Sequence, residues 1–166
     1  RLIALLSQPN VGLRRASVRA LGCFGEAAMQ PIADCFRTTD DATVRASCVK
    51  AYAQLASNYP GLPFSEGAMA VLRDGLGDDS PVVAVASVMA LGQVGAQAVA
   101  LLLEVSRGDN PAQGVAAINA LAEINDPSVE AGFNALLHEE SLDSYVKETL
   151  TSAVMRLKDL KARQAS

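Results

Sequence analysis

A pattern of apolar and small residues first occurs as LRRASVRALGC at residues 13–23 and then returns along the chain. Within that stretch the apolar and small side chains recur every three or four residues, which places them on one face of an α-helix. The pattern returns as VRASCVKAYAQ at 44–54, VAVASVMALGQ at 83–93 and QGVAAINALAE at 113–123, and more loosely as VKETLTSAVMR at 146–156. Its matching alanines are 31, 39, 30 and 33 residues apart. Repeats of this length predict stacked helical pairs.

Shorter apolar segments between the repeats supply the other helix of each pair. They lie at 1–7, 27–37, 67–76, 96–106 and 128–138. We therefore predict an all-α protein, an α-solenoid of about five helix pairs that forms a single array over residues 1–166. Its predicted units are about 1–25, 26–57, 58–95, 96–126 and 127–162. The helical pattern is already under way at Arg1, which indicates a truncated N-terminus.

Residues that favour helix starts precede three of the repeats. Asp41 precedes the second repeat, Ser80 and Pro81 precede the third, and Asn110 and Pro111 precede the fourth. Asp, Asn and Ser side chains cap the free N–H groups of a first helical turn, and proline suits its first position. These residues predict helix N-termini.

The composition excludes several classes of protein. The 166 residues are 50% hydrophobic, too apolar for a disordered chain, and only 4% aromatic, so small aliphatic side chains must fill the core. A net charge of −4 opposes nucleic-acid binding. The best candidate for a membrane span, Val82 to Leu91, is short and is broken by Ser87, which predicts no membrane span. Three cysteines without a CxxC motif indicate a reducing compartment.

Positive charge gathers in the first part of the chain. Residues 1–50 contain seven Lys or Arg and four acidic residues, whereas the remainder contains seven and fourteen. Such a division predicts a molecule with two electrostatically different ends. No GxSxG, P-loop or HExxH motif occurs, and the single histidine argues against a metal site, so the residues themselves predict no catalytic group and no cofactor.

The repeat resembles HEAT repeats of the phycobilisome-lyase type. The resemblance rests on an Asp, a short gap and Val-Arg, as in Asp40-Asp41-Ala-Thr-Val44-Arg45, and on Val88-Met-Ala-Leu-Gly92. It covers nearly the whole chain. Members of the type include phycobilin lyase subunits, phycobilisome-degradation factors and a HEAT protein that accompanies an A-type iron–sulfur carrier. The stretch Asn58-Tyr-Pro-Gly-Leu-Pro-Phe64 looks most like the last, non-lyase subgroup of cyanobacteria and plastids.

The resemblance implies a function and a setting. The main prediction is a non-catalytic scaffold or adaptor that binds a protein partner on its concave face. Its task would be the assembly or turnover of a photosynthetic or iron–sulfur component, in a plastid stroma or a cyanobacterial cytoplasm. The alternative is a phycobilin lyase-like subunit that binds a bilin chromophore. In that case Arg15, Arg19 or Lys50 would form ion pairs with the propionates of the bilin.

The resemblance also suggests where a partner would bind. In similar solenoids the second helices line the concave surface, and the exposed stripe of those helices runs from basic to apolar. The alternative is that neighbouring units cover its apolar members. The long linker between the second and third units offers two aromatic side chains, as loop anchors or as a plug at an irregular junction. The predicted partner-binding residues are therefore Arg15, Arg19, Lys50, Val85, Met89, Asn119, Tyr59 and Phe64.

The sequence and the resemblance suggest two further roles. In the family, arginines of this column pair with aspartates of the turns, which predicts a structural ladder of Arg14 and Arg45 with Asp40 or Asp79; the alternative is an anion site. Cys23 stands in a column of polar residues, one helical turn from Arg19, and is a candidate reactive thiol.

Overall fold

The computed structural model describes residues 1–164, apart from the side chains of Leu160, Lys161 and Gln164. Residues 165–166, the last two of the predicted array, lie outside the described residues. Within the described part every regular element is helical, which confirms the all-α prediction. The elements are α1 (Leu2–Leu5), α2 (Val11–Leu21), η1 (Gly25–Ala28), α3 (Met29–Thr38), α4 (Ala42–Asn58), α5 (Glu66–Leu76), α6 (Pro81–Val94), η2 (Gly95–Ala98), α7 (Val99–Ser106), α8 (Pro111–Ala122), α9 (Pro127–Leu137) and α10 (Ser144–Gln164).

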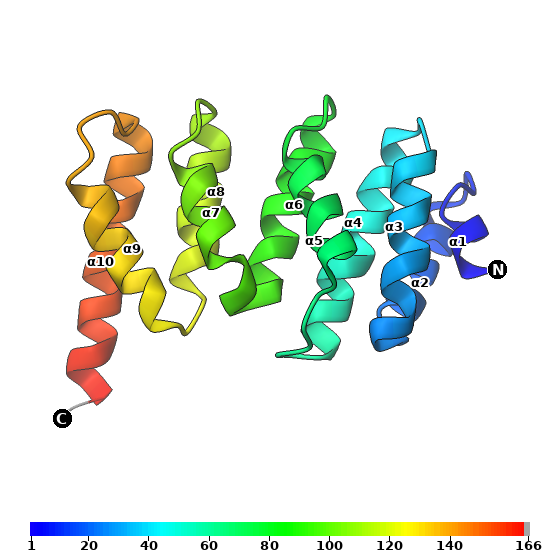
Figure 1. Cartoon of the computed structure of the whole chain (residues 1–166), viewed down its shortest axis with the longest axis horizontal. Helices are drawn as coiled ribbons and strands as arrows, with labels where there is room; N and C mark the ends of the chain where they lie inside the picture. The colour runs from blue at the N-terminus through cyan, green and yellow to red at the C-terminus, as the bar shows by residue number, and fades with distance from the viewer. Residues whose placement is uncertain (165–166) are drawn as a thin grey trace.

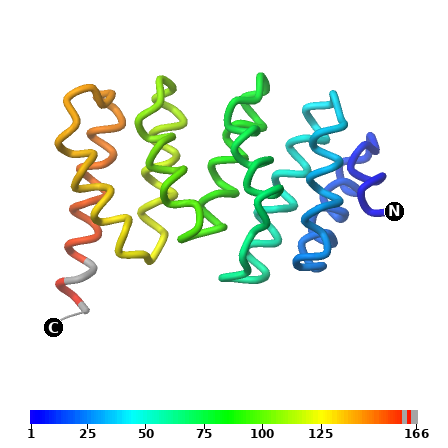
Figure 2. The backbone as a smooth tube through the Cα atoms, viewed as in Figure 1, coloured from blue at the N-terminus to red at the C-terminus, as the bar shows by residue number. Residues whose placement is uncertain are grey.

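The helices stand side by side in two layers (Figure 1). In one, which we call the second-helix layer, α2, α4, α6, α8 and α10 contact one another in that order. In the other, α1 contacts α3, α3 contacts α5, and α7 contacts α9. The tube in Figure 2 runs from one end of this row to the other, so α1 and α10 lie at opposite ends of the array. This is an α-solenoid, as the repeat pattern predicts.

Side chains cap two of the three predicted helix starts, at Asp41 and Asn110, and they also cap the start of α2. At the third predicted start, Ser80 precedes α6 and Pro81 follows it, but the Ser80 side chain makes no capping hydrogen bond. The Asn10 side chain accepts a hydrogen bond from the Leu13 N–H at 3.1 Å, and the Asp41 carboxylate accepts one from the Thr43 N–H at 2.7 Å. Asn110 caps α8 in the same way, and Pro111 follows it as the first helical residue. Each cap satisfies an N–H that the helix itself leaves free, so it fixes where the helix begins and which side chains face the groove described below.

Small residues allow the second-helix layer to pack closely. The repeat alanines Ala51, Ala90 and Ala153 have no exposed surface. A methyl group added at Gly92 of α6 would lie 3.0 Å from the Cβ of Ala120 in α8, tighter than an ordinary carbon contact. A bulky residue in this column would overpack the layer, at a cost of about 1–3 kcal/mol.

Side chains also link one repeat to the next. The Asn58 amide donates to the carbonyl oxygen of Gly22 at 2.9 Å, and the Gln113 amide donates to that of Leu76 at 3.1 Å. These bonds span 36 and 37 residues, close to the repeat length. They satisfy carbonyls at helix ends and hold adjacent helix pairs in register.

One stretch passes a composition test for a membrane span. Pro81–Ser106 is long and apolar enough, with a mean hydropathy of 1.7. In the structure, however, these residues form α6, η2 and α7, and the chain turns at Gly95, where φ is 80°. Since α6 packs against α4 and α7 packs against α8, the stretch is two core helices of the array rather than one straight rod. A core helix of a folded domain passes the same test.

Candidate functional site

A groove of about 540 Å³ lies between α2 and α4, and the start of α6 closes one end of it. The volume falls in the range of roughly 300–1,000 Å³ that is usual for small-molecule sites. Its walls combine basic, hydroxyl and aliphatic side chains. The lining residues are Val11, Arg14, Arg15, Val18, Arg19, Ala42, Thr43, Ala46, Ser47, Lys50, Gln54, Ser80 and Val82.

Three unpaired cations converge on this groove. Arg15 and Arg19 are four residues apart on α2, so they lie on the same helix face, and Lys50 faces them from α4. All three side chains are exposed, and within the described part of the chain none makes a hydrogen bond or an ion pair. Because the lining includes no Asp or Glu, the groove is suited to an anionic ligand.

Arg14 lies on the same wall but is already engaged. Its Nη1 donates hydrogen bonds to the carbonyl oxygens of Gln8 and Pro9, at 2.6 and 2.9 Å. Those bonds hold the loop before α2. Arg14 therefore does not pair with Asp40 or Asp79, and the predicted ladder is wrong at this position.

Arg45 forms an ion pair, but with an aspartate that the sequence did not single out. Its Nε and Nη2 donate to the two carboxylate oxygens of Asp78 at 2.6 and 3.1 Å, and Nη1 donates to the Thr39 carbonyl at 3.3 Å. The bonds from Arg45 hold the pKa of Asp78 below its ordinary value, and the bond from Asp78 raises the pKa of Arg45. The partner is thus Asp78 rather than Asp40 or Asp79. Asp78 and Asp79 both stand in the turn before the next repeat, so no signal in the sequence distinguished them.

We expect Asp78→Asn to lower the free energy of unfolding by about 1.5–3 kcal/mol at neutral pH, the usual contribution of hydrogen bonds to a charged group. The pKa of Asp78 is lower in the folded protein than its ordinary 3.8. The contribution of Asp78 to the free energy of unfolding is therefore fully present above pH 3.8, and it is lost as the pH falls through the lowered pKa of the folded protein. Urea unfolding between neutral and acidic pH measures both effects. If the wild type and the Asp78→Asn variant had the same free energy of unfolding at every pH, the ion pair would not contribute as assigned. Asp79→Asn is the matched control.

Tyr59 and Phe64 are not presented together as loop anchors. Phe64 is only 4% exposed, and its ring packs edge-on against Tyr52 with the centroids 5.7 Å apart. Its backbone N–H and carbonyl both bond the Gln97 amide at 2.9 Å. Phe64 is therefore a plug between units, which corrects its assignment to partner binding.

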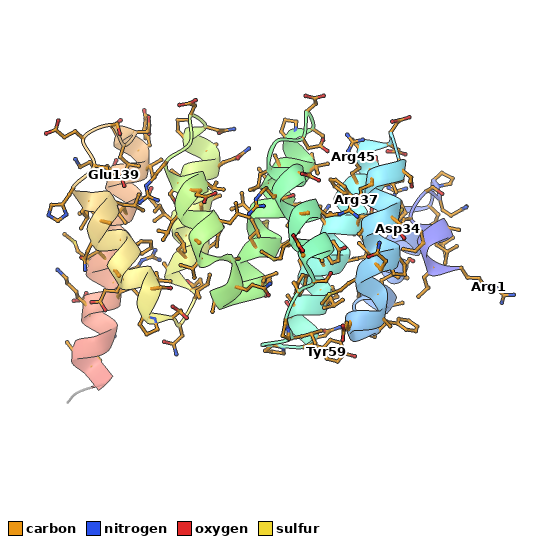
Figure 3. All side chains as sticks on the ribbon, viewed as in Figure 1. Arg1, Asp34, Arg37, Arg45, Tyr59 and Glu139 are labelled. Atoms are coloured by element: carbon orange, nitrogen blue, oxygen red, sulfur yellow. The ribbon has the colours of Figure 1, made fainter. Side chains whose placement is uncertain are left out.

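Tyr59 is half exposed, but its hydroxyl donates to the Cys23 carbonyl at 2.6 Å. Figure 3 shows Tyr59 near one edge of the array and Arg45 near the other. Tyr59 thus ties the end of α4 to the end of α2, and it is not among the groove residues.

The predicted apolar residues remain uncovered on α6. Val85 is 43% exposed and Met89 is 64% exposed, and Asn119 on α8 is exposed as well. Val82, 60% exposed on the same helix, also lines the groove. The structure thus brings Arg15, Arg19 and Lys50 together and leaves Val85, Met89 and Asn119 outside the groove. Val82 was not among the predicted binding residues, although its spacing of three and seven residues from Val85 and Met89 predicts a shared helix face.

Comparisons with known proteins identify the family to which this fold belongs. The family of HEAT repeats matches residues 69–155. The chain belongs to the HEAT-repeat family. Phycocyanin operon protein Z of Pseudanabaena tenuis (strain PCC 7409) is 42% identical to this HEAT-repeat protein over 158 residues, which are 95% of this chain and 78% of the relative. The bilin biosynthesis protein CpeZ of Synechococcus sp. (strain WH8020) is 34% identical over 166 residues, with coverage of 96% and 89%.

Solved structures show the same fold at lower identity. The complex of CpcE and CpcF of phycocyanin lyase from Nostoc sp. PCC7120 matches with a TM-score of 0.62 and 21% identity, over 92% of this chain and 95% of that one. A designed armadillo repeat protein in complex with the peptide (KR)4 matches with a TM-score of 0.53 and 15% identity, over 93% and 79%. At these identities the likeness is one of fold.

The relatives overturn the main functional prediction. They are named for bilin biosynthesis and for the phycocyanin operon, and they match this HEAT-repeat protein over nearly its full length. The predicted scaffold for a photosynthetic or iron–sulfur component is therefore wrong, and the lyase-related alternative fits the relatives better. Both relatives are cyanobacterial. The choice between cyanobacterial cytoplasm and plastid stroma stays a prediction.

The thiols do not build a site in this HEAT-repeat protein. Cys23 is exposed, with its Sγ 3.4 Å from the Arg19 carbonyl and 3.8 Å from the Asn58 amide. Cys48 is buried, and burial raises the pKa of its thiol. Over the described residues no three His, Cys, Asp or Glu side chains are grouped so that they could hold a metal ion. A reactive role for Cys23 stays a prediction.

Proposed function

We propose that this chain is a bilin lyase-like subunit that holds a linear tetrapyrrole in the groove between α2 and α4. The observation that carries the proposal is the convergence of three unpaired cations, Arg15, Arg19 and Lys50, on a groove with aliphatic walls. A bilin has two propionates and an otherwise largely apolar ring system, and the groove offers contacts for both. The names of the two relatives support the same ligand class.

The groove matches the two parts of a bilin separately. Arginine guanidinium groups bind carboxylates through paired hydrogen bonds, and an ammonium group adds a point charge, so Arg15, Arg19 and Lys50 would bind the propionates. Val11 and Val18 line the same groove and would contact the rings. The Gln54 amide nitrogen donates to Asn58 at 3.0 Å, which leaves the Gln54 amide oxygen to accept from the pyrrole N–H groups. Ser47 is buried, and its hydroxyl donates to the Thr43 carbonyl at 2.7 Å, so it belongs to the wall of the groove and not to the pigment contacts.

The chain would orient the pigment rather than move protons. In attachment, a phycobiliprotein thiol adds across an exocyclic double bond of the pigment. A bond forms between sulfur and one carbon, the thiol hydrogen ends on the neighbouring carbon, and no group leaves. The described groove lining holds no Asp, Glu, His or Cys to act as acid or base. We therefore expect a partner subunit to supply that group, and the similar phycocyanin lyase structure is itself a complex of two proteins.

Titration of the purified chain with phycocyanobilin tests this function. We expect a saturable shift in pigment absorbance with one pigment per chain, because a single groove carries the three cations. The affinity should weaken with added salt, since exposed charges are screened. An absorbance that only grows in proportion to added pigment, with no saturation, would rule the function out.

A further inference from the structure

We propose that the pigment site extends beyond the groove onto α6, where Val82, Val85 and Met89 form an apolar bed for the end of the ring system. This inference rests on the proposed function, because it names which part of the same ligand lies where. We call these three residues the α6 bed.

The first argument is continuity. Val82 lines the groove, and Val85 and Met89 lie three and seven residues further along the same helix, on one face. Counted by the repeat, Val85 and Met89 are the equivalents of Ala46 and Lys50, which line the groove from α4. Because α4 and α6 pack side by side in the second-helix layer (Figure 1), the α6 bed is the next step along the same surface.

The second argument is the division of charge. All three unpaired cations lie on α2 and α4, whereas α6 from Pro81 to Val94 contains no charged residue. A ligand whose carboxylates are bound at α2 and α4 must place its apolar rings along uncharged surface. The α6 bed is such a surface, adjoins the groove, and leaves large apolar side chains in water.

The third argument is the chemistry of the bed itself. Val82, Val85 and Met89 are 60%, 43% and 64% exposed, so each has surface left to bury against a ligand. Methionine is flexible and makes favourable contacts with aromatic systems, which suits a conjugated ring. No charged group has to be desolvated when a ring settles there.

The experiment compares two ligands on two variants. The ligands are biliverdin, which has free propionates, and biliverdin dimethyl ester, in which they are capped; phycocyanobilin serves as a third probe. Val85→Thr with Met89→Gln keeps the shape of the α6 bed and makes it polar without adding charge. Arg19→Gln removes one cation. Met155→Gln, at a 61% exposed methionine on α10, is the matched control.

We expect Val85→Thr with Met89→Gln to weaken the binding of both biliverdin and its dimethyl ester by about tenfold. This is roughly the effect of losing the burial of one or two methylene groups. Arg19→Gln should weaken the acid alone, and Met155→Gln should leave both within twofold. Unchanged affinity of the α6 variant for the ester overturns the inference and leaves the proposed function standing. Failure of the wild type to bind any of the three pigments removes both. Circular dichroism melts confirm that each variant is folded.

Discussion

Reversal of the three groove cations, Arg15→Glu, Arg19→Glu and Lys50→Glu together, should weaken pigment binding by about 100-fold or more. Each charged hydrogen bond is usually worth about 1.5–3 kcal/mol, and about 1.4 kcal/mol is a factor of ten, so the loss of two such contacts already accounts for this. The introduced carboxylates would also repel the propionates. Absorbance titration with phycocyanobilin measures the effect.

A matched variant separates this local effect from net charge. Arg73, Lys147 and Arg156 are exposed and lie outside the groove, and their reversal to Glu changes the net charge by the same amount. We expect that control to bind pigment within about threefold of the wild type, because exposed charges more than about 10 Å away are screened at ordinary ionic strength. Equal losses in the two variants would mean that binding follows net charge and that the groove is not the site.

The second large effect concerns stability. Phe64→Ala should lower the free energy of unfolding by about 3–5 kcal/mol, the usual cost of truncating a buried aromatic side chain. The side chain is 4% exposed and packs against Tyr52, whose hydroxyl in turn donates to the Met29 carbonyl at 2.7 Å. Removal of the ring leaves a cavity where the second and third predicted units meet. Urea unfolding followed by circular dichroism measures the loss.

Phe24 provides the comparison for Phe64. It is 59% exposed, so Phe24→Ala should change stability by less than about 0.5 kcal/mol, as is usual for surface substitutions. The Phe64 variant should still bind pigment with near wild-type affinity at temperatures where it is folded, since Phe64 does not line the groove. If the folded Phe64→Ala protein no longer bound pigment, Phe64 would have to be counted among the binding residues.

The helices were predictable because their signals are local. The spacing of apolar residues fixes the buried face of each helix, and caps such as Asp41 and Asn110 fix where helices begin, so neighbouring residues carry the information. The convergence of Arg15, Arg19 and Lys50 was also within reach, since repeat equivalence places them on the same layer.

The misassigned contacts depend on geometry between repeats. Whether Arg45 reaches Asp78 or Asp79 is decided by the path of a turn, and adjacent aspartates look alike in sequence. Phe64 follows Pro63 in a linker whose prolines and glycine are typical of an exposed loop, yet Tyr52 and Gln97 from other units enclose it. No pattern near Phe64 in the sequence reports those partners. The main functional prediction was wrong because the same repeat serves proteins with different ligands, so the repeat pattern alone does not distinguish them, whereas the relatives of this chain do.

The absence of charge along α6 has a practical consequence. In the proposed site, moderate ionic strength would weaken carboxylate contacts to the cations of α2 and α4, whereas α6 carries no charge to be screened. The salt dependence of pigment affinity would therefore report the propionate contacts of the proposed site, and the part of the affinity that survives at moderate salt would come mainly from the rings. The two contributions to pigment affinity could thus be compared in the wild-type protein, without any substitution.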